Sequence, residues 1–85
     1  MQKPRTPEGG KNLVHNRLKE IREEKGLSQR GLARELQLLG YDMDKNVITR
    51  IETNKRYITD VELKALVEVF GVSYDYLIEG KEKDK

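Results

Sequence analysis

The chain contains no cysteine and no tryptophan, and it has one phenylalanine and two prolines among its 85 residues. The lack of cysteine excludes disulfide bonds and thiolate metal sites. No apolar run approaches the roughly 20 residues that a membrane-spanning helix needs, and the polar N-terminus does not resemble a signal peptide. We therefore expect a small cytoplasmic protein that has no membrane contact and folds around one aliphatic core.

Positive charge is concentrated in the first part of the chain. The formal net charge is only +2, but residues 1–56 contain 13 lysines and arginines against 8 acidic residues, whereas residues 57–85 contain 4 against 7. Such an imbalance can arise by chance in a charge-rich domain, and it can also mark a surface that binds a polyanion. The charge distribution alone leaves both interpretations open.

Four segments carry the same local signal for the start of a helix. In each, a small polar residue that can accept a hydrogen bond from a first-turn amide is flanked by two apolar residues that can pack over it. These polar residues are Ser28, Asp44, Thr59 and Ser73. A fifth helix precedes Gly26, a natural left-handed stop. Since no segment alternates as a strand would, the pattern predicts an all-α fold with five short helices.

The spacing of apolar residues sets approximate limits for these helices and for the domain. The first helix ends near residue 25, the second spans about 29–39, the third about 45–53, the fourth 60–70, and a short fifth follows residue 73. We assign residues 12–79 to a single domain. Residues 1–11, which hold both prolines and two adjacent glycines, predict a flexible basic arm, and residues 80–85 predict a charged, disordered tail.

The third predicted helix carries the most distinctive polar side chains. Its Ile48 and Ile51 are spaced to face the core, and the small Ala33 would let the second helix cross it closely. Arginine can pair with guanine in bidentate fashion, asparagine can pair with adenine, and threonine offers a hydroxyl or a methyl group. The opposite side of this helix is therefore suited to read base edges, through Lys45, Asn46, Thr49 and Arg50.

At this point a resemblance to a known family is evident. The stretches RLKEIREEKGLSQRGLAREL, ITRIETNKR and ELKALVEVFGVSYDYLI occur together and in order, and from residue 18 to residue 77 they resemble the Cro/repressor-type helix-turn-helix family of phage and bacterial regulators. The resemblance covers about 60 of the 85 residues. It implies a compact, five-helix, lambda-repressor-like domain that binds double-stranded DNA.

The resemblance also implies roles for individual residues. The base-reading positions of the recognition helix match Lys45, Asn46, Thr49 and Arg50. The positions that bind backbone phosphates match Ser28, Gln29, Asn54, Lys55 and Arg56. A structural ion pair between the first and third helices matches Arg22 and Glu52.

The chain departs from the family in the turn between the second and third helices. Where the family has a glycine at the ninth position of the motif, this chain has Gln37, and the connection from there to Ile48 is longer than the family's by roughly five residues. We expect a longer second helix, with Gly40 taking over as its break. The lengthened turn affects how deeply the third helix can enter the groove, and Tyr41 or Asp42 could either add or block a contact.

The resemblance implies a sequence-specific transcriptional regulator, a repressor that acts by occluding a promoter and that binds a palindromic site as a homodimer. A different interpretation is an antitoxin-like interaction module that uses DNA binding for autoregulation. An enzyme is disfavoured because no catalytic triad, metal cluster or phosphate-binding glycine loop is present, and His15 stands alone. We expect no catalytic residue, metal, cofactor or small-molecule ligand.

Overall fold

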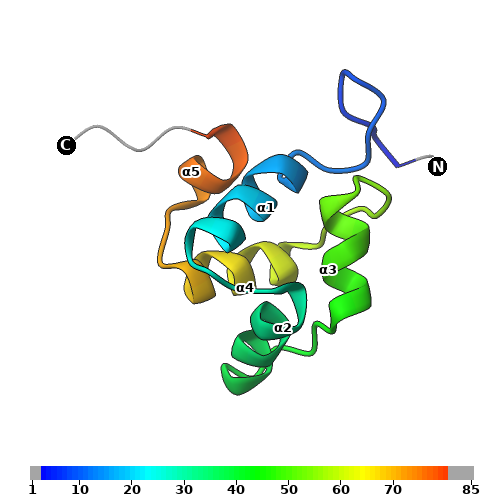
Figure 1. Ribbon diagram of the computed structural model, residues 1–85. Coiled ribbons are helices and arrows are strands. Elements are labelled where there is room, and N and C mark those ends of the chain that lie inside the picture. The colour runs from blue at the N-terminus through cyan, green and yellow to red at the C-terminus, as the bar shows by residue number, and fades with distance from the viewer. Residues whose placement is uncertain (1–2, 81–85) are drawn as a thin grey trace.

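The computed structural model describes residues 3–80, and within them it contains five α-helices and no strand (Figure 1). The helices are α1 (His15–Glu24), α2 (Gln29–Leu38), α3 (Lys45–Glu52), α4 (Asp60–Phe70) and α5 (Tyr74–Glu79). The predicted all-α, five-helix fold is confirmed, and the helix ends lie within a residue of the expected ones. The first two residues of the expected arm and residues 81–85 of the expected tail lie outside the described part of the chain.

The four predicted helix starts are all capped as their local pattern indicates. The side chains of Ser28, Asp44 and Ser73 each accept a hydrogen bond from the amide three residues ahead. Thr59 forms a complete capping box, because its hydroxyl accepts from the Glu62 amide while the Glu62 carboxylate accepts from the Thr59 amide. Each cap satisfies an amide that would otherwise have no partner in the first turn.

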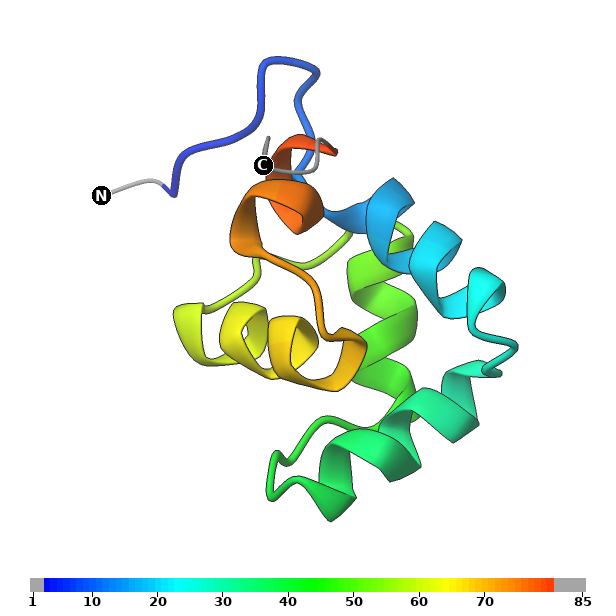
Figure 2. The same ribbon diagram turned by 90° about the vertical axis from the view of Figure 1, so that its left-hand side faces the viewer.

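The helices enclose one core, and their order places α3 at an edge of the molecule. Figures 1 and 2 show α1 and α5 at one end, α2 at the other end, and α4 between them. Leu18, Leu32, Leu36, Ile48 and Ile51 are fully buried at the centre of this arrangement. Ala33 is also buried, which is consistent with a close crossing of α2 and α3. Within residues 3–80, no helix has the length and apolarity that crossing a bilayer would require.

The lengthened turn between α2 and α3 is packed against the rest of the domain. Gly40 has a φ of 96°, so it ends the α2 region in the left-handed conformation that the sequence indicated. Met43 is buried, and the Tyr41 hydroxyl donates a hydrogen bond to the Glu68 carboxylate of α4. This hydrogen bond raises the pKa of the Tyr41 phenol above its ordinary value. The extra residues are thus attached to the core through Met43 and to α4 through Tyr41.

Candidate nucleic-acid interface

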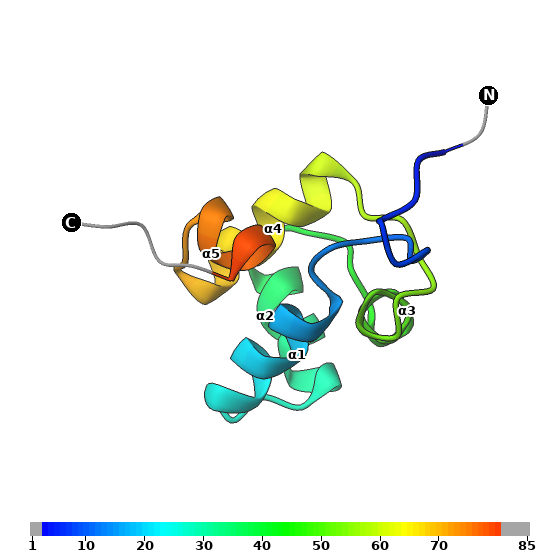
Figure 3. The same ribbon diagram turned by 90° about the horizontal axis from the view of Figure 1, so that it is seen from above.

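The exposed face of α3 is polar over its whole length. Lys45, Asn46 and Arg50 are exposed and Thr49 is half-buried, whereas Ile48 and Ile51 on the opposite side are completely buried. The helix lies at the edge of the fold, with α1, α2 and α4 all on one side of it (Figures 1 and 3). The four residues expected to read bases are therefore brought together on one helix, and three of them are open to solvent.

A depression of about 480 Å³ separates α2 from the beginning of α3. Besides Asp44, Lys45 and Asn46, it is lined by two arginines of α2, Arg30 and Arg34. These two side chains are exposed and lie one helical turn apart. The sequence analysis did not identify these two arginines. Their spacing of four residues on the exposed side of the second helix could have predicted a basic surface there. Their charge offsets that of the Asp44 cap, which alone would repel a phosphate.

Gln29, at the start of α2, has its side chain occupied by the protein itself. The Thr49 hydroxyl donates to Gln29 Oε1 at 2.8 Å, and Gln29 Nε2 donates to Glu52 Oε1 at 3.0 Å. The structure therefore ties the first residue of α2 to two residues of α3. The group that remains for a phosphate here is the first-turn backbone of α2, next to the exposed Ser28.

Arg22 and Glu52 form a bidentate ion pair between α1 and α3. Arg22 Nε lies 2.6 Å from Glu52 Oε2, and Arg22 Nη2 lies 3.1 Å from Glu52 Oε1. The two side chains are only 10% and 4% exposed, and Arg22 Nη1 also donates to the Leu27 carbonyl at 2.8 Å. The hydrogen bond to Glu52 raises the pKa of Arg22, and burial partly opposes this rise. Together with Gln29, the pair fixes the angle of α3 relative to α1 and α2.

The three residues of the loop after α3 that were expected to bind phosphates differ in the partners of their side chains. Lys55 is exposed. The Arg56 guanidinium is paired with the Glu62 carboxylate, with 2.6 Å between Nη2 and Oε2. The side chain of Asn54 is turned inward, where its Oδ1 accepts hydrogen bonds from the amides of Lys11 (2.9 Å) and Asn12 (3.0 Å). Of the three, Lys55 alone presents a side chain with no bonded partner among residues 3–80.

Asn12 holds the end of α3 in place, and sequence reasoning did not identify it. Its side chain is buried, and Nδ2 donates to the carbonyls of Ile51 (3.1 Å) and Arg56 (2.9 Å). Its Oδ1 accepts from the Val14 amide at 3.2 Å, just before α1 begins. These three backbone partners lie at the end of α3, in the loop that follows it and just before α1, so the Asn12 side chain joins the three segments. No local pattern could reveal this role, because two of its partners lie about 40 residues away in the chain.

Asn54 combines a side-chain role with a backbone role, and two substitutions separate them. Its φ of 61° makes it the one described residue other than glycine with a left-handed backbone. We expect Asn54→Gly to lower the free energy of unfolding by about 1 kcal/mol, since it keeps the left-handed backbone and loses the side chain that accepts two hydrogen bonds. Asn54→Ala adds left-handed strain and should cost about 2 kcal/mol. Urea denaturation followed by circular dichroism measures both, and equal losses would contradict the division.

Comparison with known proteins agrees with the sequence motifs and the helical geometry. A family model described as helix-turn-helix, of the Cro/repressor type, matches residues 18–77, which is well over half of the chain. The matched segment runs from α1 to α5 and includes the α2–α3 unit described above. Comparison with curated proteins and with solved structures found no match.

Proposed function

We propose that this chain, which belongs to the Cro/repressor-type helix-turn-helix family of DNA-binding transcriptional regulators, is a sequence-specific repressor that covers a promoter. The observation that carries the proposal is the exposed polar face of α3, held rigidly by the buried Arg22–Glu52 pair and by Gln29. A helix of this kind fits the major groove, where its N-terminal residues meet base edges first.

In the proposed complex, each polar side chain of α3 contacts a different base. Arg50 would donate two hydrogen bonds to a guanine, Asn46 would pair with an adenine, and Lys45 would donate to an acceptor at the groove edge. The hydroxyl of Thr49 is already engaged with Gln29 and with the Lys45 carbonyl. Thr49 therefore has its methyl group to offer, and a thymine methyl is the matching partner.

Backbone contacts would set the register of α3 on the duplex. The first turn of α2, from Ser28, points free amides at one phosphate, and Lys55 meets another phosphate beyond the end of α3. Arg30 and Arg34 line the depression beside the start of α3 and add positive charge there. These contacts release counterions and supply most of the affinity, whereas base contacts choose the sequence.

The chain is proposed to act as a homodimer on a palindromic site. Two copies related by a twofold axis would present their α3 helices about 34 Å apart, one turn of the duplex. Five large apolar side chains are exposed among the described residues: Leu13 (58%), Leu38 (76%), Leu39 (52%), Val61 (60%) and Tyr74 (46%). They are available to such a contact, and their small number indicates that dimerisation depends largely on DNA.

The decisive experiment is selection of binding sites from a random duplex library at fixed salt. We expect an enriched palindromic motif, and the wild-type protein should then compete with RNA polymerase for a promoter that carries it. If no motif is enriched, sequence-specific repression is wrong, and the antitoxin-like interaction module becomes the better interpretation. If a motif is enriched but transcription rises, the chain is an activator.

Lys55 provides a test of the backbone contacts. We expect Lys55→Ala to weaken binding to the selected site and to random duplex by the same factor, because a phosphate carries no sequence information. The slope of the logarithm of affinity against that of salt concentration should fall by about 0.9. Titrations monitored by fluorescence anisotropy at several salt concentrations measure both quantities. Lys64→Ala, on the exposed face of α4, is the matched control and should change neither.

A further inference from the structure

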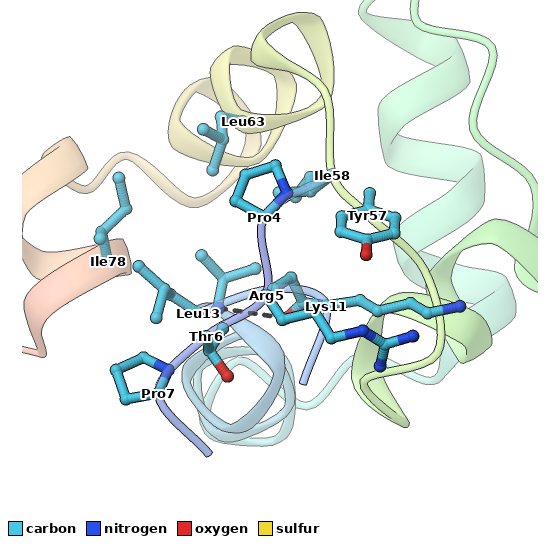
Figure 4. A pocket seen from close by; sticks show the side chains of 12 residues that line it. Pro4, Arg5, Thr6, Pro7, Lys11, Leu13, Tyr57, Ile58, Leu63 and Ile78 are labelled. Carbon is cyan, nitrogen blue, oxygen red and sulfur yellow. Dashed lines mark hydrogen bonds between the residues drawn. The ribbon is translucent and has the colours of Figure 1, made fainter. Parts of the chain in front are cut away.

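Three cationic side chains from the segment before the matched helix-turn-helix region gather around one aromatic ring of the loop after α3. The Nζ atoms of Lys3 and Lys11 lie 5.0 Å and 5.5 Å from the centroid of the Tyr57 ring. Together with Arg5 they line an open space of about 420 Å³. Figure 4 shows the Arg5 and Lys11 side chains running in the same direction past Tyr57. We call these four residues the Tyr57 cluster.

The backbone that carries the cluster is attached to the end of α3. The amides of Gly9 and Thr6 donate to the carbonyls of Thr6 and Gly10, which closes a turn. The backbone of Gly10 then packs so tightly on Asn54 that a Cβ atom at Gly10 would lie 2.0 Å from Asn54 Nδ2. The next two amides are bonded to Asn54 Oδ1. The position of the cluster is therefore fixed relative to the recognition helix.

The attachment places the cluster at the end of α3, on the side of the molecule where α3 lies. Figures 1 and 3 both show the N-terminal segment crossing the end of α3 and extending beyond it on the side where α3 lies. Lys55, on the loop between α3 and Tyr57, is exposed at the same end. A duplex along the exposed face of α3 would continue past this end of the helix.

Electrostatics indicate that the cluster has an anionic partner. Among residues 3–80, the ion pairs are Arg17–Glu20, Arg22–Glu52 and Arg56–Glu62, so no carboxylate neutralises Lys3, Arg5 or Lys11. The two ammonium groups contact the ring, and Arg5 Nη1 donates to the Gly9 carbonyl at 3.1 Å. Like charges brought together repel one another, and an anion placed between them removes that cost.

We propose that the Tyr57 cluster binds backbone phosphates of DNA that flank the sequence read by α3. Lys3 and Lys11 make the contacts, and Tyr57 holds both ammonium groups near its ring so that little side-chain freedom is lost on binding. The inference rests on the proposed function, because it needs a duplex already seated on α3. It extends the footprint by at least one phosphate beyond the contacts of α2, α3 and Lys55.

The test compares two double variants that remove the same charge. Lys3→Gln/Lys11→Gln changes the cluster, and Lys19→Gln/Lys64→Gln is the control, because Lys19 and Lys64 are exposed on α1 and α4. On a selected site with long flanks, the cluster variant should lose about 0.9 of the salt slope for each phosphate contact removed. On a duplex trimmed to the bases that α3 covers, the cluster variant and the wild type should have equal slopes.

Phosphate ethylation interference on the long duplex gives an independent measurement. Ethylation of flanking phosphates should weaken the wild type and the control variant but not the cluster variant. If the wild type binds the selected site and the cluster variant matches the control in slope and interference pattern, the inference is wrong while the proposed function stands. If the wild type shows no salt-dependent binding to the duplex, both are wrong.

Discussion

Replacing Glu52 with alanine is expected to lower the free energy of unfolding by about 3–5 kcal/mol. The substitution leaves the Arg22 guanidinium buried at 10% exposure with only the Leu27 carbonyl as a partner, and it removes an acceptor from Gln29. A loss of this size is a large part of the total stability of a domain with fewer than 100 residues. Urea denaturation followed by circular dichroism at neutral pH measures it.

The control for this prediction removes both charges at once. Arg22→Met/Glu52→Leu should unfold within about 1 kcal/mol of the wild type, because a well-packed apolar pair avoids the desolvation of two ions. The exposed pair of Arg17 and Glu20 provides a second comparison, and replacing Glu20 with alanine should cost less than about 1 kcal/mol. A loss below 1 kcal/mol for Glu52→Ala would contradict the proposal that the buried pair supports α3.

The apolar double variant also separates stability from DNA binding. It would restore the core, but it cannot accept the hydrogen bond from Gln29 Nε2, so the chain from Glu52 through Gln29 to Thr49 is broken. We infer that the ion pair is retained for the orientation of α2 and α3 more than for stability. A buried polar network of this kind favours one arrangement of helices over others of similar packing energy.

The helices could be predicted from the sequence because their signals are local. Thr59 and Glu62 are three residues apart, and Ser28 accepts from the amide of Gly31, so each cap is contained in a few consecutive residues. Apolar spacing then assigned Ile48 and Ile51 to the core. The motifs identified the family, and the family resemblance assigned base reading to the exposed face of α3.

The family resemblance supplied the Arg22–Glu52 pair, but the bonding of Gln29 and Asn54 could not be predicted, because it depends on contacts between distant segments. Gln29 and Asn54 were expected to lie at phosphate-binding positions, and the partners of their side chains within the protein lie on α3 and at residues 11–12. Asn12 and Tyr57 sit in polar or irregular segments, where nothing nearby indicates a contact. Such roles can be identified only in the folded structure, where the segment before α1 meets the end of α3.

Arg50 carries the largest effect expected on DNA recognition. Arg50→Ala should weaken binding to the selected site by about 1–3 kcal/mol, roughly 5- to 150-fold, and relax the preference at one base pair. The side chain is exposed and makes no hydrogen bond or ion pair within residues 3–80, so the free energy of unfolding should change by less than about 0.5 kcal/mol. Anisotropy titrations against the selected site and against each single-base variant measure the change.

A charge-preserving substitution shows whether Arg50 acts by geometry or by charge. Arg50→Lys keeps the positive charge but loses the planar fork that pairs with guanine O6 and N7, so it should lose discrimination while the salt slope stays near that of the wild type. Lys55→Ala should show the opposite pattern, a smaller slope with unchanged base preference. If Arg50→Lys keeps the wild-type preference at every position, Arg50 contributes only charge, and base reading belongs to Asn46 and Lys45 at the start of α3.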